Sequence, residues 1–380
     1  MSKDVWVTGY NPNNPKWGAG YGGFMARLGL ANATFGKDRV GVWENRIDFQ
    51  LLSFQTIFEI VNSYVTALRQ YGEPNFIISG WQDYGGTDIV NYAAQYLSSN
   101  APPVKISVTS SAGAYNQADV VVEPIFFPSG IKNEKTVIMN AIPNIVTLET
   151  LLSQSLIAQT AIPLDIENED FMTVMVGGPQ KIPTTLKAMG RELAEKAIDL
   201  ADQKGLNLIF ITSPRTLPRL IEGINLKVQD YIQNHGDPVK IHLYQHIIDD
   251  PMNPYPGILG LPRNRLVIVT RDSLSLLSEA MASPVPVAIF SPWQQASPGF
   301  QAMFDNFRKN GFAPSLEDIE RLDPGQWESG KKIYNTTLET AQSLRKNLID
   351  RGFAQPGSFP TIQPISLPRI PYQPHRQPGT

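Results

Sequence analysis

At 380 residues the chain is longer than one hydrophobic core usually supports, so its length favours two domains over one. A content of 42% hydrophobic and 18% charged residues is ordinary for a globular enzyme and argues against disorder or a fibrous architecture. The net charge of −3 gives no general attraction to nucleic acid or to an anionic membrane. Zero cysteines exclude disulfides, thiolate metal sites and a cysteine nucleophile.

The N-terminal segment MSKDVWVTGY runs directly into a predicted strand and carries no basic segment followed by an apolar core. No uninterrupted apolar stretch approaches the roughly 20 residues that a membrane-spanning helix needs. We therefore expect a cytoplasmic protein without a transmembrane segment.

In the first half of the chain, short β-branched runs alternate with longer segments of helical period. This alternation is typical of parallel strands joined by crossover helices, and it predicts an α/β fold. The predicted strands are Val5–Gly9, Val40–Trp43, Phe76–Ser79, Lys105–Thr109, Val120–Glu123 and Thr136–Met139. The clearest predicted helices are Gly23–Ala31, Ser53–Tyr71 and Asp88–Leu97.

A second series of the same kind follows. Its predicted strands are Phe171–Val176, Leu206–Thr212, Lys240–Leu243, Leu266–Thr270 and Val285–Phe290. Its predicted helices are Thr184–Gln203, Pro218–Asn234, Ser275–Met281 and Gly299–Asn310. Two such series predict two Rossmann-like, doubly wound domains that face a cleft, with the ligand beyond the carboxyl ends of the strands.

The expected boundaries are an N-terminal domain over residues 1–160 and a C-terminal domain over residues 161–325, joined at the polar run IENED. A long amphipathic helix is predicted at Glu328–Arg351, inside a segment over residues 326–354 that crosses back to the first domain. The tail over residues 355–380 carries proline at nearly every third or fourth position, which favours extended backbone. Such a tail is solvated, clasps the domains, or binds a proline-recognising partner through LPRIPYQP.

The segment KWGAGYGG places Gly18, Gly20 and Gly23 in a G-x-G-x-x-G arrangement. A dinucleotide fingerprint must connect strand and helix directly, whereas this segment starts nine residues past the first strand. We instead expect a glycine-rich acceptor loop, with Lys16, Gly18 and Gly20, whose backbone can approach a phosphate or a sugar.

The loop SGWQDYGG follows the third predicted strand and places Asp83 among aromatic residues and glycines. A carboxylate in such a setting can have a raised pKa and act as a general base. The alternative is that Asp83 caps a turn or the next helix.

Two strand ends in the second half carry groups suited to phosphate. VMVGGP ends a strand with Gly177 and Gly178 ahead of a helix, so backbone amides and the helix dipole can hold a diphosphate. The next strand ends in ITSPRT, where Ser213 and Arg215 add a hydroxyl and a cation at the same sheet edge.

The segment over residues 253–280 contains the densest pattern of polar groups. A predicted strand delivers Asp272, Ser273 and Ser275 to its carboxyl end, and the following helix carries Ser278 and Glu279. Hydroxyls and carboxylates at such a place can hold ribose hydroxyls. The alternative is plain helix capping by Asp272 or Ser273, with Glu279 exposed.

His242 and His246 are four residues apart, but KIHLYQHII is typical of a strand that runs into a loop rather than of a zinc-binding helix. We expect no metal site and no tightly bound cofactor.

The stretches VMVGGP, ITSPRT, NPYPGILGL and VTRDSLSLLSEA resemble the "elongated mitochondria" family of mitochondrial-fission proteins and their bacterial relatives, in the same order. Weaker likenesses are ADVVVEP and NAIPNIVTLETL. This resemblance implies a glycosyltransferase-B fold. It also implies a donor site for a nucleoside diphosphate sugar, formed by the following residues: Gly177, Gly178, Ser213 and Arg215 at the diphosphate, Glu279 at the ribose, and Asn253 and Tyr255 at the base or sugar.

The function implied is a metal-independent glycosyltransferase, with the nucleotide sugar as donor and Asp83 as the base that activates an acceptor hydroxyl. The acceptor is left open among a glycan, a lipid and a modified DNA base. A second hypothesis is a non-catalytic adaptor, because plant members resemble this chain yet recruit a dynamin-type protein. A third is transfer of sugar to a hydroxymethylated DNA base, as in related phage enzymes, although the net charge argues mildly against it.

Overall fold

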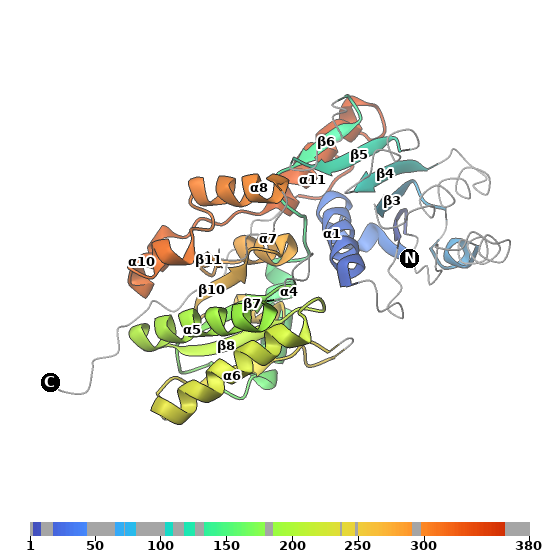
Figure 1. Ribbon diagram of the computed structural model, residues 1–380. Coiled ribbons are helices and arrows are strands. Elements are labelled where there is room, and N and C mark those ends of the chain that lie inside the picture. Colours follow the sequence, from blue (N-terminus) through green and yellow to red (C-terminus); the bar gives the residue numbers. More distant parts are fainter. Residues whose placement is uncertain are drawn as a thin grey trace. The chain divides into compact units, whose positions relative to one another are not determined.

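The computed structural model describes residues 3–8, 18–43, 65–71, 73–80, 103–108, 118–125, 133–178, 185–235, 238–247, 250–290 and 298–361 (Figure 1). The chain forms two compact units. Unit 1 contains Met1–Ile145 and Asn335–Gln363, and unit 2 contains Val146–Tyr334 and Pro364–Thr380. Unit 1 is therefore built from two segments that are far apart in the sequence.

Unit 1 is organised around a six-stranded parallel sheet with strand order β2-β1-β3-β4-β5-β6. Its strands are β1 (Val5–Thr8), β2 (Val40–Trp43), β3 (Phe76–Gly80), β4 (Val104–Val108), β5 (Val120–Pro124) and β6 (Thr136–Met139). Strand β1 lies between β2 and β3, so the chain reverses its winding direction at β1, as in doubly wound folds.

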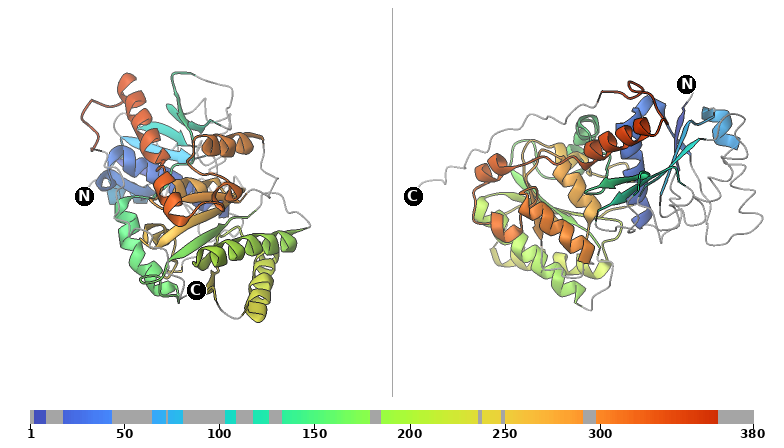
Figure 2. Two further views of the ribbon diagram at one scale, coloured as in Figure 1. Left: turned by 90° about the vertical axis from the view of Figure 1, so that its left-hand side faces the viewer. Right: turned by 90° about the horizontal axis from the view of Figure 1, so that it is seen from above.

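One face of this sheet is covered by helices α1 (Gly18–Phe35) and α11 (Thr336–Asp350), which lie side by side (Figure 2). Alternate strand residues such as Val5 and Val7 point to this face and pack with Leu30 of α1 and Leu344 of α11, all fully buried. The side-chain period of two in a strand explains why these positions share one face. Helix α11 thus completes the core of a sheet formed mainly by the first 145 residues.

Unit 2 contains a five-stranded parallel sheet with strand order β11-β10-β7-β8-β9. Its strands are β7 (Phe171–Val176), β8 (Asn207–Thr212), β9 (Ile241–Tyr244), β10 (Asn264–Thr270) and β11 (Val287–Phe290). The chain moves outward from β7 to β9 and then returns to place β10 on the other side of β7. The carboxyl ends of β7 and β10 therefore form the topological switch point, where open α/β sheets bind their ligands.

Helices flank the sheet of unit 2 (Figure 1). They are α4 (Leu148–Ala161), α5 (Leu186–Lys204), α6 (Pro218–His235), η4 (Gly257–Gly260), α7 (Leu274–Ala282), α8 (Pro298–Lys309), α9 (Leu316–Ile319) and α10 (Pro324–Gly330). Helices α5 and α6 pack tightly on each other because Gly190 and Gly223 leave room for the facing backbone. A Cβ atom on Gly190 would lie 2.2 Å from the Leu220 carbonyl oxygen.

The division between the units falls after Ile145, not near residue 160 as the polar run suggests. Helix α4, which the sequence analysis does not predict, packs on η4 of unit 2. The run IENED is not a free linker either. Its last residue, Asp170, is 4% exposed and bonds to two arginines at the start of β10.

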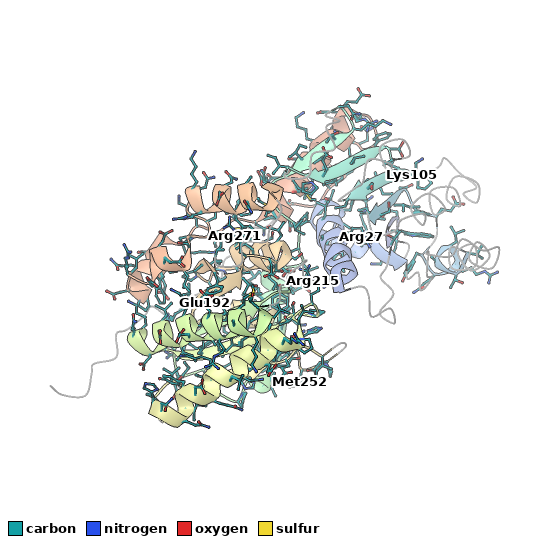
Figure 3. The ribbon with its side chains drawn as sticks, viewed as in Figure 1. Arg27, Lys105, Glu192, Arg215, Met252 and Arg271 are labelled. Atoms are coloured by element: carbon teal, nitrogen blue, oxygen red, sulfur yellow. The ribbon has the colours of Figure 1, made fainter. Side chains whose placement is uncertain are left out.

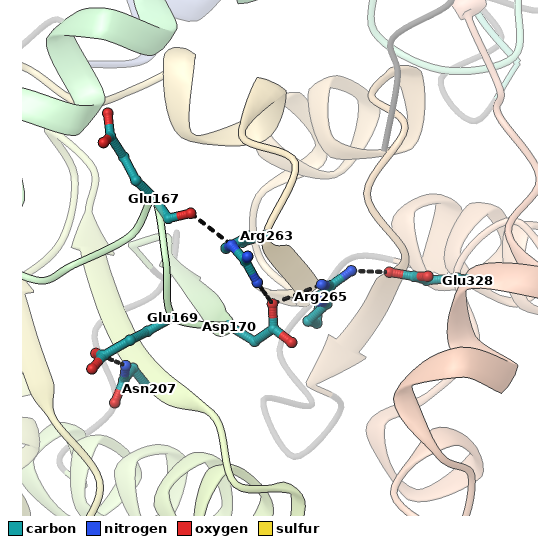
Figure 4. A network of polar contacts seen from close by, with 7 residues as sticks. All are labelled: Glu167, Glu169, Asp170, Asn207, Arg263, Arg265 and Glu328. Carbon is teal, nitrogen blue, oxygen red and sulfur yellow. Dashed lines mark hydrogen bonds and ion pairs between the residues drawn. The ribbon is translucent and has the colours of Figure 1, made fainter. Parts of the chain in front are cut away.

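Those bonds belong to a polar network at the amino-terminal edge of the unit 2 sheet (Figure 4). The fully buried Arg265 donates to Asp170 at 2.7 Å and to Glu328 of α10 at 2.7 Å. Arg263 donates to Asp170 at 3.2 Å and to the Glu167 carbonyl. The network ties β7, β10 and α10 together at the edge opposite the switch point.

The C-terminal segment also differs from expectation. The long helix predicted at Glu328–Arg351 is interrupted, because α10 ends at Gly330 and Asn335 begins a new helix by accepting a hydrogen bond from the Leu338 backbone N–H. Past the helix, Phe359 packs on the unit 1 core with its ring centroid 5.7 Å from that of Phe35, and Arg345 donates to the Pro360 carbonyl. Residues 355–361 are thus part of unit 1 rather than a separate tail.

Among the described residues, no helix is both long and apolar enough to span a bilayer.

Candidate functional site

The loops that follow β7, β8 and β10 come together at the carboxyl edge of the unit 2 sheet. They carry the Gly177–Gly178 pair, Arg215 and Asp272, and Figure 3 labels Arg215 with its neighbour in this region, Arg271. The Thr270 hydroxyl at the end of β10 accepts a 2.8 Å hydrogen bond from the Gly177 backbone N–H. This bond joins the two strand ends that define the switch point.

At both glycines of VMVGGP there is no room for a side chain. A Cβ atom on Gly177 would lie 2.6 Å from a carboxylate oxygen of Asp272, and one on Gly178 would lie 1.9 Å from the Arg215 carbonyl oxygen. Any side chain at Gly178 would therefore push the β8 loop away. The glycine pair places three loops in contact, because the missing Cβ atoms let the backbones approach closely.

The segment Ser213–Thr216 forms a turn that is bonded to itself. The Thr216 hydroxyl donates to the Val176 carbonyl at 2.7 Å and accepts from the Ser213 backbone N–H at 2.8 Å. The Ser213 hydroxyl accepts from the Arg215 backbone N–H at 3.3 Å. These bonds fix the position of Arg215 within the turn.

Two positive features remain available at this edge. Within the described part of the chain, the Arg215 guanidinium forms no salt bridge, although its charge acts on Asp272. Helix α7 begins at Leu274; its N-cap residue Ser273 makes no side-chain capping bond, and Ser275 lies on its first turn. Backbone N–H groups at a helix N-terminus and a nearby arginine are typical partners of phosphate groups.

Asp272 does not cap α7. Both of its carboxylate oxygens are buried, and among the described residues neither forms a hydrogen bond of regular geometry, although the Thr270 hydroxyl lies near them. Burial raises the pKa of Asp272 to about 6, although the Thr270 hydroxyl and the charge of Arg215 lower it. The capping interpretation is wrong for this residue.

Glu279 is buried in α7, with 7% of its surface exposed, so the interpretation of an exposed glutamate is wrong as well. The Tyr255 hydroxyl donates a hydrogen bond to its carboxylate. Burial raises the pKa of Glu279 to about 8. The contact brings the NPYPG segment and α7 together, two stretches that are 24 residues apart.

The remaining expected residues have structural bonds. The Asn253 side chain accepts from the Tyr255 backbone N–H at 3.0 Å and so shapes the NPYPG loop. The Ser278 hydroxyl donates to the Leu274 carbonyl one turn back in α7, at 2.8 Å. Neither bond depends on a ligand.

His242 lies in β9 and His246 follows it, so the pair is not on a helix. Burial lowers the pKa of His242. The residues described include no cluster of three histidine or acidic side chains that could hold a metal ion.

The residues expected on the acceptor side are only partly described by the structure. Asp83 and Lys16 lie outside the described residues. Gly18 and Gly20 lie in the first turn of α1, which begins at Gly18, so the expected loop is a helix at these two positions. The prediction was wrong because glycine is unfavourable in helices, and α1 forms in spite of it.

A buried polar row that was not predicted from the sequence lies at the carboxyl edge of the unit 1 sheet. It contains the last residue of β1 and the second-last residues of β3, β4 and β5, which share the face opposite α1 and are at most 3% exposed: Thr8, Ser79, Ser107 and Glu123. Ser79 and Ser107 are direct partners in the β3–β4 register. The signal was available, since each is a polar residue at or next to the end of an apolar strand.

Arg27 of α1, which Figure 3 labels, approaches the same edge of the sheet. Its guanidinium is 3% exposed and donates to the Thr8 carbonyl at 3.2 Å. Because α1 was predicted to start only at Gly23 and Arg27 has no motif around it, no sequence signal singled it out.

The fold is similar to that of two solved structures. The UDP-GlcNAc 2-epimerase of Methanocaldococcus jannaschii has a TM-score of 0.54 and 10% identity, over 92% of this chain and 100% of that chain. The S. aureus protein MnaA, solved with UDP, has a TM-score of 0.51 and 11% identity, over 95% of this chain and 99% of that chain. These similarities, with the two parallel sheets, confirm the α/β glycosyltransferase-B type of fold.

A search of curated protein sequences found no match. The sequence profile described as mitochondrial fission ELM1 matches residues 114–348, which include β5, β6 and the described strands and helices of unit 2. The match contains all four stretches on which the resemblance was based. It spans more than half of the sequence, and the chain therefore belongs to the mitochondrial fission ELM1 family.

Proposed function

We propose that the protein binds a nucleoside diphosphate sugar at the carboxyl edge of the unit 2 sheet and transfers its sugar to an acceptor hydroxyl. The observation that carries this proposal is the switch point between β7 and β10, where Gly178, Arg215 and the uncapped start of α7 adjoin. Ligands of open α/β sheets bind at such a point. The S. aureus neighbour, which shares the fold, was solved with UDP.

In this proposal the diphosphate lies between Arg215 and the N-terminus of α7. The backbone N–H of Gly178 and the hydroxyls of Ser273 and Ser275 supply further donors. The N–H of Gly177 is already bonded to Thr270. Positive charge at these positions stabilises the negative charge that grows on the leaving diphosphate, so the chemistry requires no metal.

Glu279 and Tyr255 form the nucleoside side of the site. A buried carboxyl group held by a tyrosine hydroxyl can bond to ribose hydroxyls with fixed geometry. Ring stacking on Tyr255 is the proposed contact for the base, and Asn253 holds the backbone of that loop. Asp83 remains the proposed base that accepts the proton of the acceptor hydroxyl.

Calorimetry with uridine, guanosine, cytidine and adenosine diphosphates tests this donor site. Replacing Glu279 with Gln is expected to weaken binding of the preferred nucleotide by about 2- to 10-fold, because the raised pKa keeps Glu279 mostly neutral at pH 7 and a hydrogen bond between neutral groups contributes about 0.5–1.5 kcal/mol. The exposed Glu192 on α5 provides the matched control, and Glu192→Gln should bind as the wild type does. If no nucleotide binds the wild type, the adaptor hypothesis replaces this one.

Product analysis separates transfer from its alternatives. Incubating the protein with UDP-GlcNAc and no acceptor, followed by NMR of the sugar, shows epimerisation if the chain shares the activity named for its M. jannaschii neighbour. Release of UDP that depends on an added glycan, lipid or hydroxymethylated DNA supports transfer and identifies the acceptor class. Salt-sensitive binding to duplex DNA is the further mark of the DNA acceptor.

A further inference from the structure

Asp272 is an unusual residue for a diphosphate site, because it places a carboxyl group where negative charge is to be bound. Both carboxylate oxygens are buried, and within the described part of the chain neither forms a hydrogen bond of regular geometry. They lie 2.6 and 2.7 Å from the position that a Cβ atom on Gly177 would occupy. The carboxyl group thus packs against the glycine loop at the end of β7.

The charged groups around Asp272 do little to hold its negative charge. Arg215, from the loop after β8, acts through its charge but forms no salt bridge with it. Arg271, next in sequence, is paired with Asp305 at 3.3 Å and lies over the Phe304 ring of α8. Glu279 of α7 is bonded to Tyr255. Burial therefore outweighs the attraction, and it raises the pKa of Asp272 to about 6.

A diphosphate placed beside Asp272 changes this balance further. A carboxylate would repel the phosphate oxygens, whereas a carboxylic acid can donate its proton to one of them. Other proteins keep a buried carboxylic acid neutral for the same purpose of donating a hydrogen bond. One added proton would therefore change the Asp272 carboxyl group from a hydrogen-bond acceptor into a donor.

We propose that Asp272 takes up a proton when a nucleoside diphosphate binds, and that its carboxylic acid then donates a hydrogen bond to a phosphate oxygen. The proton comes from solvent and forms an O–H bond at Asp272, and it returns to solvent when the nucleotide leaves. This inference rests on the proposed function of the same site.

A divalent cation bridging Asp272 and the phosphates is the competing arrangement, since Mg²⁺ is often held by one carboxylate and substrate phosphates. The proton is favoured because both carboxylate oxygens are buried against the glycine pair at the end of β7, where burial already favours the neutral carboxyl group. The experiment below distinguishes the two.

The test is calorimetric titration of the wild-type protein with UDP at pH 7, in PIPES buffer and in Tris buffer. The difference in apparent enthalpy between two buffers of different ionisation enthalpy gives the number of protons taken up. We expect an uptake approaching one proton per UDP, and an affinity that falls up to about tenfold per pH unit between pH 6.5 and 8. Binding should be the same with Mg²⁺ and with EDTA.

Asp272→Asn provides the second arm, because asparagine keeps the size and always offers a donor. It should bind UDP at pH 7 at least as tightly as the wild type, with no proton uptake at this position and a flatter pH profile. Since Glu279 also titrates in this range, the buffer comparison is repeated in Glu279→Gln at higher UDP concentrations, where the uptake should persist.

The outcomes are separable. UDP binding without proton uptake, or loss of binding in a folded Asp272→Asn, overturns the role of Asp272 and leaves the proposed function standing. Binding that requires Mg²⁺ and is lost in Asp272→Asn assigns a cation to the site instead. No binding of UDP or of any other nucleoside diphosphate overturns the proposed function and this inference with it.

Discussion

The carboxyl group of Glu279 makes stability depend on pH. Its pKa is raised from 4.5 to about 8 by burial, so the folded protein binds this proton more tightly than the unfolded chain. The contribution is fully present below the unfolded pKa, and it is lost as pH rises through the folded pKa. We expect the free energy of unfolding to fall between about pH 4.5 and pH 8, as measured by urea denaturation across this range.

The matched comparison uses two glutamines. Glu279→Gln should flatten the decline in this pH range, because glutamine does not titrate, whereas Glu192→Gln on the exposed face of α5 should leave it unchanged. An equally steep decline in both variants would show that other groups cause the pH dependence.

Gly178 is the glycine with the least room at the site. A Cβ atom there would lie 1.9 Å from the Arg215 carbonyl, so Gly178→Ala must push the loop after β8 out of place. We expect a loss of about 1–3 kcal/mol in unfolding free energy and weaker nucleotide binding. Thermal melting and calorimetry measure the two effects.

Gly325 in α10 is the control, because nothing lies within 4 Å of a Cβ atom built there. Gly325→Ala should leave stability unchanged or raise it by up to about 1 kcal/mol. A neutral Gly178→Ala would mean that the three loops are not packed as closely as described.

Among the elements of unit 2, β7, β10 and α10 depend on the buried pair of Asp170 and Arg265, which are 3% and 0% exposed at their side chains. Removing one partner leaves the other charge buried, and Asp170→Ala should lower the unfolding free energy by about 3–5 kcal/mol. The exposed pair Lys187–Glu222 between α5 and α6 is the comparison, and Glu222→Ala should cost less than about 1 kcal/mol. Similar losses in urea denaturation of the two variants would contradict the role given to burial.

The helices and strands were largely predictable, because the spacing of apolar residues along the sequence differs between a helix and a strand. Strands such as β2 and β6 have the predicted bounds, since each is a short β-branched run between turn signals. Helix α4 was missed because its sequence LETLLSQSLIAQTA has one charge and no clear polar face. The break between α10 and α11 was missed because helical period continues through it, and only the capping bond of Asn335 marks it.

The position of the candidate site could be predicted from the sequence, but the burial and hydrogen bonds of its side chains could not. Sequence could place Asp272 and Glu279 after β10, because parallel strands end at one edge. It could not distinguish a capping Asp272 from a buried, unbonded one, since the difference depends on Gly177 and Arg215 from other loops. The Ser213 hydroxyl appeared free for the same reason, as its bonds form only in the folded turn.

At the scale of the whole molecule, the last described residues belong to the core of unit 1. Phe359 is half-buried against Phe35, and the Pro360 and Ser358 carbonyls accept bonds from Arg345 and Arg39. Removing these contacts should cost about 2 kcal/mol. A chain ending at Ala354 should therefore melt about 4–8 °C below one ending at Thr361.

Comparing these two truncated chains isolates residues 355–361 from the proline-rich residues beyond them. Both are measured by thermal unfolding under the same conditions. Equal melting temperatures would restore the view of a tail that starts at Gln355 and adds nothing to the core.

Because unit 1 is built from two segments far apart in the sequence, the parts of its core are synthesised at different times. Its sheet is translated first, but α11, which covers that sheet, is translated only after the intervening segment Val146–Tyr334. At about 5–20 residues per second, those roughly 190 residues take on the order of 10–40 s to synthesise. Throughout that interval the apolar face of the unit 1 sheet lacks the cover of α11 and, among the described helices, has only that of α1. Unit 2, whose sheet and helices come from one continuous segment, can fold first, so we expect nascent chains to need chaperone protection at their N-terminal rather than their C-terminal half.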